Sequence, residues 1–275
     1  MFKQAVNFGG AVEDLQTKIA SSDSINIVGT NSTGVASNEN EDEELKAPAG
    51  IISYEPDELM ISVFAGTEIR EVNVELQAAQ QRIVIPDWGT IGGAVATRRN
   101  GLRETHHQTL PNNVLRCTVI AADGSLYQAG GQVVKNVSGF DLVKLLVGSW
   151  GLLGLIVEVT MRTEPLPQVS QWVKSAHPQA REQASKLYRP AVETLIEGVT
   201  YLLLEGHQND VEQQISLLKG FVLCEMPSLG HQYQYQNLNF LSQEPVRSIE
   251  RGIRKQFDPT NKFNKKIAAQ RNLLT

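Results

Sequence analysis

The chain has 275 residues and a formal net charge of −5 at pH 7, a length that suffices for one large or two modest domains with a buried core. The acidic balance and the lack of a basic cluster with interleaved aromatic residues argue against a nucleic-acid surface. No run of eighteen apolar residues occurs, so the sequence contains no candidate membrane span.

The cysteines and the N-terminal segment predict the compartment. Cys117 and Cys224 lie in apolar runs without metal-ligand spacing, which predicts buried free thiols in a reducing environment. The first residues lead into a polar helical segment rather than a signal-peptide core. We expect a cytoplasmic location, with peripheral association at the inner face of the membrane through partners left open. We expect no metal site and no iron–sulfur ligands in this chain.

The first part of the chain predicts alternating helices and strands. Residues 11–20 carry apolar side chains at positions 12, 15 and 19, the spacing of one helix face. A strand at 24–28 ends at Gly29, and the acidic segment 34–44 is expected to be a solvated loop. A helix is expected at 69–80, and strands at 51–54, 59–65 and 83–85.

The middle of the chain predicts a hairpin followed by a helix and a strand. Residues 115–121 and 125–129 are joined by Ala122-Asp123-Gly124, a hairpin turn signal. A helix at 140–147 and a strand at 154–162 follow. Because their composition is richer in glutamine, residues 168–245 are interpreted as a second, smaller domain. It has helices expected at 178–188 and 209–219 and strands at 170–174, 199–205 and 221–225.

Two glycine-rich stretches are the most informative features. Residues 130–158 contain six glycines between short apolar runs, so their main chain passes closely by either a flat cofactor or another strand. Residues 86–96 contain the pair Gly92-Gly93, which forms either an anion-binding nest or a structural turn. No Gly-Lys-Ser/Thr follows, and no G-x-G-x-x-G lies between a strand and a helix. The Walker loop and the dinucleotide fingerprint are therefore absent.

Five motifs occur in the order and spacing of a known family: TIGGAVAT, NNVLRCTVIAADG, GGQVVKNVSGFD, GSWGLLGLIVEVTMRTEPLP and RGIRKQFDPTNKFN. Through them the chain resembles the FAD-linked oxidases of the para-cresol methylhydroxylase and vanillyl-alcohol oxidase superfamily. Within it, the likeness is greatest to the small FAD-binding subunit of bacterial glycolate oxidase. The resemblance implies an α+β class, with a two-subdomain FAD-binding fold and a short α/β cap domain. The FAD-binding domain would be 1–167, the reduced cap or substrate domain 168–245, and the closing segment 246–275.

The resemblance also implies the residues that would hold a non-covalent FAD. Backbone amides of two loops would bind the pyrophosphate, the first loop being Gly29, Thr30, Asn31, Ser32, Thr33 and Gly34, and the second Thr90, Ile91, Gly92 and Gly93. The other implied contacts are Thr109, Asn112 and Asn113 in the flavin-contacting segment, Ile156 beside the adenine part, and Asn264 near the ring.

The chain departs from the family at some of these positions. The first loop lacks two glycines of the usual Arg-Gly-Gly-Gly-Thr, Leu152 replaces a usual threonine, and Lys265-Lys266 follow Asn264 where Pro-Gly is usual. Two hypotheses therefore stay open. Either the chain binds FAD, or it is a degenerate, non-catalytic subunit that kept the fold and lost the cofactor.

The implied chemistry is oxidation of a 2-hydroxy acid by hydride transfer to flavin. Electrons would pass to partners, a larger flavin subunit and an iron–sulfur subunit. His106 and His107, the candidate catalytic residues, are either solvated or act as a base near the substrate. Arg98, Arg99 and Arg103 follow the Gly-Gly turn, where they either attract an anionic substrate or phosphate or are ordinary surface charges.

Overall fold

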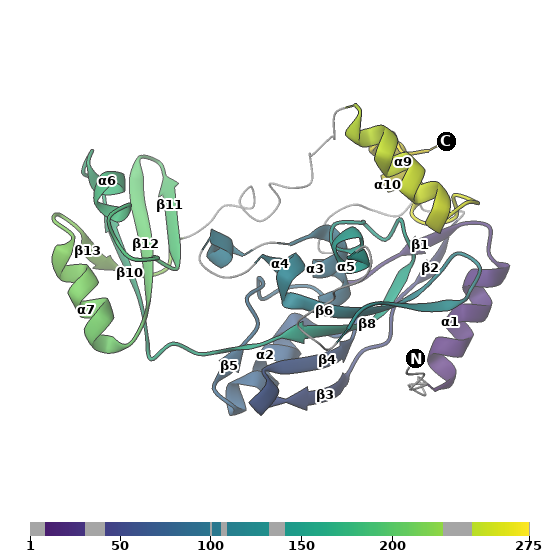
Figure 1. Cartoon of the computed structure of the whole chain (residues 1–275), viewed down its shortest axis with the longest axis horizontal. Coiled ribbons are helices and arrows are strands. Elements are labelled where there is room, and N and C mark those ends of the chain that lie inside the picture. The colour runs from purple at the N-terminus through teal and green to yellow at the C-terminus, as the bar shows by residue number, and fades with distance from the viewer. Residues whose placement is uncertain are drawn as a thin grey trace.

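The computed structural model describes residues 9–30, 42–99, 101–105, 109–131, 141–227 and 244–274. A larger body is built around a five-stranded sheet, and a four-stranded sheet with its own helices lies at one end of the molecule (Figure 1). Helix α1 and the short strands β1 and β2 lie at the opposite end.

The N-terminal helix and strands match most of the sequence expectations. Their bounds are Gly10–Ser21 for α1, Ile25–Ile27 for β1 and Glu43–Leu45 for β2. The apolar stripe of α1 is confirmed, since positions 12, 15 and 19 are buried. The end of the predicted acidic loop is wrong: β2 pairs in parallel with β1, and Leu45 is buried in the core that α1 and β1 share. Although Glu43 and Glu44 are exposed, their backbone joins the sheet because Leu45, the next residue of the strand, is buried.

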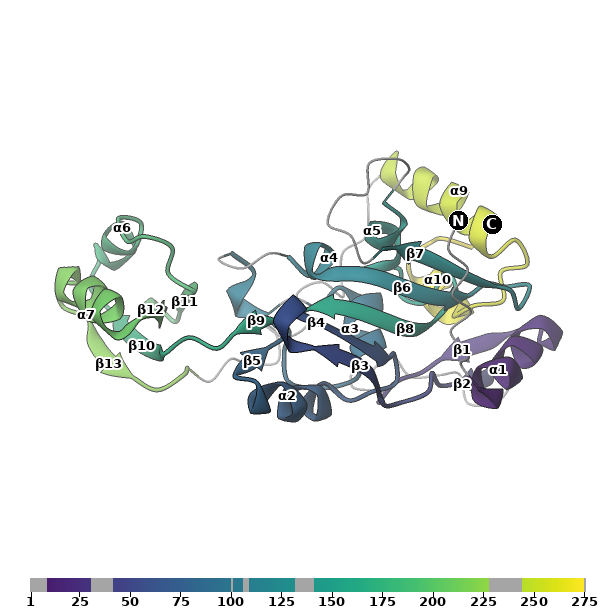
Figure 2. The ribbon, with the colours of Figure 1, turned by 60° about the horizontal axis from the view of Figure 1, so that its bottom comes forward.

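The five-stranded sheet is antiparallel throughout and has the order β3-β4-β8-β6-β7. Its strands are β3 Ile51–Glu55, β4 Met60–Phe64, β6 Val114–Ile120, β7 Leu126–Gly130 and β8 Leu155–Arg162. One face shares a hydrophobic core with the helices α2 Ile69–Ala78, α3 Ile91–Thr97, α4 Leu110–Asn113 and α5 Leu142–Leu146. Figure 2 shows this sheet across its width. The predicted hairpin is confirmed as β6 and β7, with Gly124 at a φ of 82°.

The strand predicted at Ile83–Ile85 is wrong. Ile83 and Ile85 are buried in the main core, but their backbone joins no sheet. An apolar run shows only that side chains are buried, whereas strand pairing depends on a partner edge. The residues just before this run do form a strand: β5 (Gln81–Arg82) pairs with β9 (Glu164–Pro165).

The four-stranded sheet is antiparallel and has the order β11-β12-β10-β13. Its elements are β10 Val169–Ser175, α6 Ala180–Ala184, β11 Val192–Ile196, β12 Val199–Gly206, α7 Gln208–Leu217 and β13 Val222–Cys224. Strand β11 was not predicted. Its signal was the Glu197-Gly198 turn, where both residues have positive φ and join β11 to β12 as a hairpin. Cys224 is half-buried rather than buried, because β13 is the edge strand.

One carboxylate ties the four-stranded sheet to the larger body. Glu205 on β12 accepts hydrogen bonds from Arg82 Nη1 and Nη2, at 3.1 and 2.7 Å, and from Arg103 Nη2 at 2.8 Å. Arg82 Nε also donates to Glu164 at 2.7 Å. Burial alone lowers the pKa of Arg82, but its hydrogen bond to Glu205 and the charge of that carboxylate, followed by those of Glu164, raise it overall. Arg103 therefore forms an ion pair that joins the larger body to the four-stranded sheet.

The C-terminal segment returns to the N-terminal end of the molecule (Figure 1). This segment contains the helices α9 (Val246–Phe257) and α10 (Lys265–Gln270) and the turn between them. Phe263 is fully buried and forms a parallel bridge with Ile25 of β1. Lys262 Nζ donates to the Ile19 carbonyl at 2.7 Å. The last thirty residues therefore complete the core that α1 and β1 begin. Within the described parts of the chain, no helix is long and apolar enough to cross a membrane.

Candidate functional site

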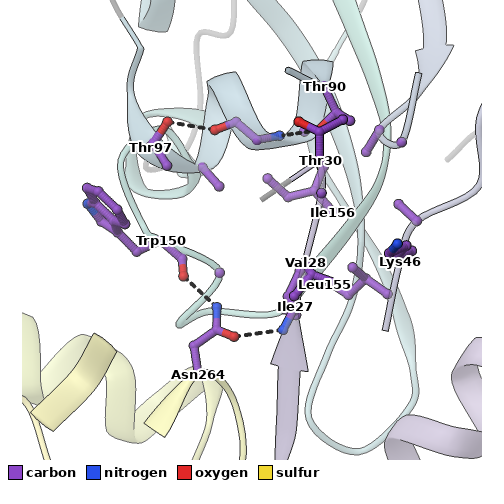
Figure 3. A pocket seen from close by; sticks show the side chains of 18 of the residues that line it. Ile27, Val28, Thr30, Lys46, Thr90, Thr97, Trp150, Leu155, Ile156 and Asn264 are labelled. Carbon is purple, nitrogen blue, oxygen red and sulfur yellow. Dashed lines mark hydrogen bonds between the residues drawn. The ribbon is translucent and has the colours of Figure 1, made fainter. Parts of the chain in front are cut away.

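A pocket of about 330 Å³ lies where segments from six parts of the chain meet. Its walls come from the end of β1, the residues after β2 and after β4, helix α3, the turn before β8 with the first residues of that strand, and the start of α10 (Figure 3). The lining residues are Asn26, Ile27, Val28, Gly29, Thr30, Lys46, Ala47, Ala65, Gly66, Glu68, Thr90, Gly92, Gly93, Ala96, Thr97, Arg99, Trp150, Gly151, Gly154, Leu155, Ile156, Asn264 and Ile267. This volume is within the range of sites that bind small molecules and cofactors.

The described start of the first loop touches the second loop. A Cβ built on Gly29 would lie 2.9 Å from Thr90 Oγ1, and one on Gly93 would lie 3.0 Å from the same oxygen. Thr90 is the N-cap of α3, and its Oγ1 accepts the Gly93 amide at 3.1 Å. Thr30 and Thr90 both lie at one side of the pocket in Figure 3. The two loops are therefore neighbours, and glycine at position 29 permits their approach.

The opposite side of the pocket is closed by Asn264. Its Oδ1 accepts the Ile27 amide at 2.7 Å, and its Nδ2 donates to the Trp150 carbonyl at 2.7 Å (Figure 3). Its backbone is left-handed, with a φ of 44°, a geometry that asparagine tolerates. One side chain thus joins β1, the turn at Trp150-Gly151 and the C-terminal segment. The amide holds this wall together rather than projecting freely into the pocket.

The structure brings some of the predicted cofactor-binding residues together and leaves others apart. Those that line the pocket are Gly29, Thr30, Thr90, Gly92, Gly93, Ile156 and Asn264. Ile91 is fully buried in the main core, while Thr109, Asn112 and Asn113 lie at helix α4 and do not line the pocket. Outside the described residues are Asn31, Ser32, Thr33, Gly34, His106 and His107.

Residues 21–130 match a family model described as an FAD binding domain. This stretch contains both loops and most of the five-stranded sheet. The chain carries an FAD binding domain.

Relatives of this FAD-binding chain confirm the resemblance to FAD-linked oxidases. It is 31% identical over 189 residues to the glycolate oxidase subunit GlcE of Escherichia coli K12, a match that covers 64% of the chain and 54% of that protein. It is 28% identical over 144 residues to the mitochondrial cytochrome D-lactate dehydrogenase of Arabidopsis thaliana, covering 52% of the chain and 25% of that enzyme. The chain therefore spans about half the length, or less, of these two relatives.

A solved structure of alkyldihydroxyacetonephosphate synthase has the same fold. It superposes with a TM-score of 0.69 over 92% of the chain and 73% of its own length, at 11% identity. This match and the family model confirm the predicted two-subdomain fold of the para-cresol methylhydroxylase type. The FAD binding domain and the glycolate oxidase relatives indicate FAD as the cofactor.

The hydrogen-bond donors of the pocket fit FAD only in part. The amides of Ile91, Gly92 and Gly93 already donate within the protein, to Thr67 O, Ala65 O and Thr90 Oγ1 respectively, at 3.0, 2.7 and 3.1 Å. They are therefore not available as a nest for phosphate. The first loop is different, because no described residue accepts a hydrogen bond from the amides of Gly29 and Thr30.

Side chains supply further donors. Asn26 lines the pocket, and its buried Nδ2 has no hydrogen-bond partner in the part of the chain that the structure describes, which favours a ligand acceptor nearby. Arg99 and Lys46 bring two cations to the walls, against the single carboxylate of Glu68 among the described lining residues. This surplus of positive charge and amide donors suits a diphosphate.

Sequence reasoning missed several lining residues, among them Asn26, Lys46, Thr97 and Trp150. Trp150, which has a φ of 56°, packs beside α10 and also lines the pocket. The sequence did hold a signal for Asn26. Successive side chains of a strand point to opposite faces, so a strand that buries Ile25 in the core presents Asn26 on the other face. Lys46 had no local signal, since it reaches the pocket only through the pairing of β2 with β1.

Proposed function

We propose that the chain is the FAD-binding subunit of a glycolate-oxidase-like dehydrogenase that oxidises a 2-hydroxy acid. One observation carries this proposal: inside an FAD binding domain, the turn after β1 and the turn before α3 meet at a single pocket. Relatedness to glycolate oxidase and D-lactate dehydrogenase proteins supports the substrate class, since both names specify 2-hydroxy acids.

Residues of this chain would hold the cofactor from several sides. Gly29, Thr30 and Asn26 line the pocket, and neither the backbone amides of the first two nor the side-chain amide of Asn26 has an acceptor among the described residues, while Ile156 and Leu155 provide an apolar wall. FAD, when bound, supplies the capacity to accept a hydride from the substrate carbon. No histidine is among the described lining residues, and Glu68 is the one carboxylate there. We propose that substrate deprotonation falls to His106, to His107 or to a group of a partner subunit, since both histidines lie outside the described residues.

The proposal includes a complex. Two of the matched relatives are named as subunits of glycolate oxidase, GlcE of Escherichia coli and GlcD of Bacillus subtilis. We propose that electrons leave this chain through a larger flavin subunit and an iron–sulfur subunit. The described residues contain no cluster of three or more His, Cys, Asp or Glu that could hold a metal. We also propose that the complex is cytoplasmic and peripheral to the membrane.

A second candidate is a non-catalytic assembly subunit with the same fold. The observation that favours it is the internal use of the amides at 91–93, together with the missing glycines of the first loop. This candidate predicts a protein that keeps its fold but does not bind FAD.

Isolation of the complex under mild conditions distinguishes the two candidates. We expect this chain, separated from its partners, to be yellow and to release FAD on denaturation. The intact complex should reduce an artificial acceptor with glycolate or D-lactate. A colourless chain that takes up no added FAD would support the assembly subunit. A yellow complex inactive with every 2-hydroxy acid would contradict the substrate class.

A further inference from the structure

Arg99 is a buried cation in the pocket wall. Its residue is 6% exposed, and it lies just after helix α3. The guanidinium carbon lies 3.5 Å from the centroid of the Trp88 ring, and Nη1 donates to the Trp88 carbonyl at 2.6 Å. Stacking and hydrogen bonding to one residue together hold the planar group in a fixed orientation.

The backbone determines which arginine enters the pocket. Helix α3 ends at Thr97, its C-cap Arg98 turns the chain with a left-handed φ of 49°, and the Arg99 amide donates back to the Ala94 carbonyl at 2.8 Å. This turn leaves Arg98 exposed and buries Arg99. Arg99 Nη2 then lies 3.9 Å from the position that a Cβ on Gly93 would occupy, beside the second loop.

We propose that the Arg99 guanidinium binds the diphosphate of FAD, in place of the backbone amides that the second loop does not offer. The inference rests on the proposed function, because it requires an FAD ligand. The amides of 91–93 donate inside the protein, whereas Arg99 borders the same loop and lines the pocket. A guanidinium presents paired N–H donors that match two phosphate oxygens, and a buried site strengthens that contact.

The test compares two adjacent arginines in the whole chain stripped of flavin. Arg99→Gln removes the charge in the pocket, and Arg98→Gln removes an exposed charge one residue away. Titrations with FAD, ADP and adenosine separate the diphosphate from the rest of the cofactor. For Arg99→Gln we expect the Kd for FAD and for ADP to rise by about 10- to 100-fold, with adenosine binding unchanged. Arg98→Gln should stay within about threefold of wild type for all three probes.

Each outcome decides the inference. If Arg99→Gln binds FAD and ADP like wild type, or loses affinity for FAD but not ADP, the diphosphate contact does not exist. Should Arg99→Gln fail to fold, Arg99→Lys replaces it as the deciding variant. This change keeps the charge but loses the planar fork, so we expect FAD and ADP to bind about 3- to 10-fold more weakly. Unchanged binding by Arg99→Lys would then overturn the inference.

Failure of the proposed function gives a different result. A correctly folded wild-type chain that binds neither FAD nor ADP overturns both proposals together. A wild-type chain that binds FAD, beside an Arg99→Gln variant that binds equally well, overturns only the role of Arg99.

Discussion

The glycines of the five-stranded sheet and those of the pocket look alike in sequence but do different work. In the sheet, a Cβ on Gly130 would lie 2.1 Å from the Leu115 carbonyl oxygen and 2.7 Å from Val143 Cγ2. At the pocket, the described atoms nearest to a Cβ on Gly29 would belong to the side chain of Thr90, the first of them at 2.9 Å. Gly130 allows two stretches of main chain to pack against one another, whereas Gly29 leaves room for the Thr90 side chain where the two loops meet.

This contrast answers a question that the glycine-rich stretch 130–158 left open. Gly130 and Gly154 approach neighbouring strands, since a Cβ on Gly154 would lie 2.7 Å from the Ile120 carbonyl. Gly151 is next to the pocket, but the nearest atom to its missing Cβ is Asn264 Nδ2, at 2.6 Å. Most of the described glycines in this stretch therefore allow close packing within the protein. They act on the pocket only indirectly, by positioning the segments that form its walls.

The largest effect is expected for Gly130→Ala. The residue has a φ of 82°, and the added methyl would overlap a backbone oxygen that cannot move without disturbing β6. We expect the free energy of unfolding to fall by about 3–5 kcal/mol. Urea unfolding followed by circular dichroism measures this change. A loss below about 1 kcal/mol would show that the strands are not in van der Waals contact here.

Asn264→Ala should have the next largest effect. The change leaves the Ile27 amide and the Trp150 carbonyl without their side-chain partners, and it places alanine at a φ of 44°. We expect a destabilisation of about 2–4 kcal/mol and weaker FAD binding. Asn272→Ala is the matched control, because Asn272 has a φ of 54° but is exposed. Equal losses in the two variants would assign the whole effect to backbone strain.

Gly29→Ala should affect binding more than stability. Its φ is not positive, and the contact it creates is with the Thr90 side chain, which caps α3. We expect a stability loss of about 1 kcal/mol and a roughly tenfold rise in the Kd for FAD. The double variant Gly29→Ala/Thr90→Ala should lose less stability than the sum of the single variants. Additive losses would indicate that the two loops do not touch.

Gly131→Ala is expected to have the smallest effect and the opposite sign. Although it follows Gly130 directly, its backbone is not left-handed, and a Cβ there would meet no atom of the described residues within 4 Å. Restricting the unfolded chain should stabilise the protein by about 0.4–1 kcal/mol. Thermal unfolding of the two neighbouring variants in parallel gives the comparison. A destabilised Gly131→Ala variant would contradict the distinction drawn between these adjacent glycines.

Local patterns were sufficient for most of the fold. The helix at 10–21 and the β6–β7 hairpin follow from periodicity and turn residues, and strand β8 follows from an apolar run that ends before prolines. The errors arose where pairing was decided at a distance. Strand β2 forms because β1 offers it an edge, and Ile83–Ile85 are buried without an edge to join.

The candidate site was less accessible to sequence reasoning. The order of five motifs pointed to an FAD fold and to the loops that begin at Gly29 and Thr90, and these loops do meet. The motifs placed Asn264 near the cofactor, and the structure shows that its side chain ties β1 to the turn at Trp150. Such a role depends on three segments that are distant along the chain.

The amino-acid sequence alone determined the family likeness, the glycine positions and most of the segments that become strands and helices, because these depend on local conformation and on motif order. The tertiary structure decided which donors remain for a ligand. A sequence cannot show that the amides of 91–93 donate to Ala65, Thr67 and Thr90, or that a left-handed turn buries Arg99 and leaves Arg98 exposed. A donor is used within the protein when an acceptor from any other segment lies within about 3 Å of it, and only the folded chain sets those distances.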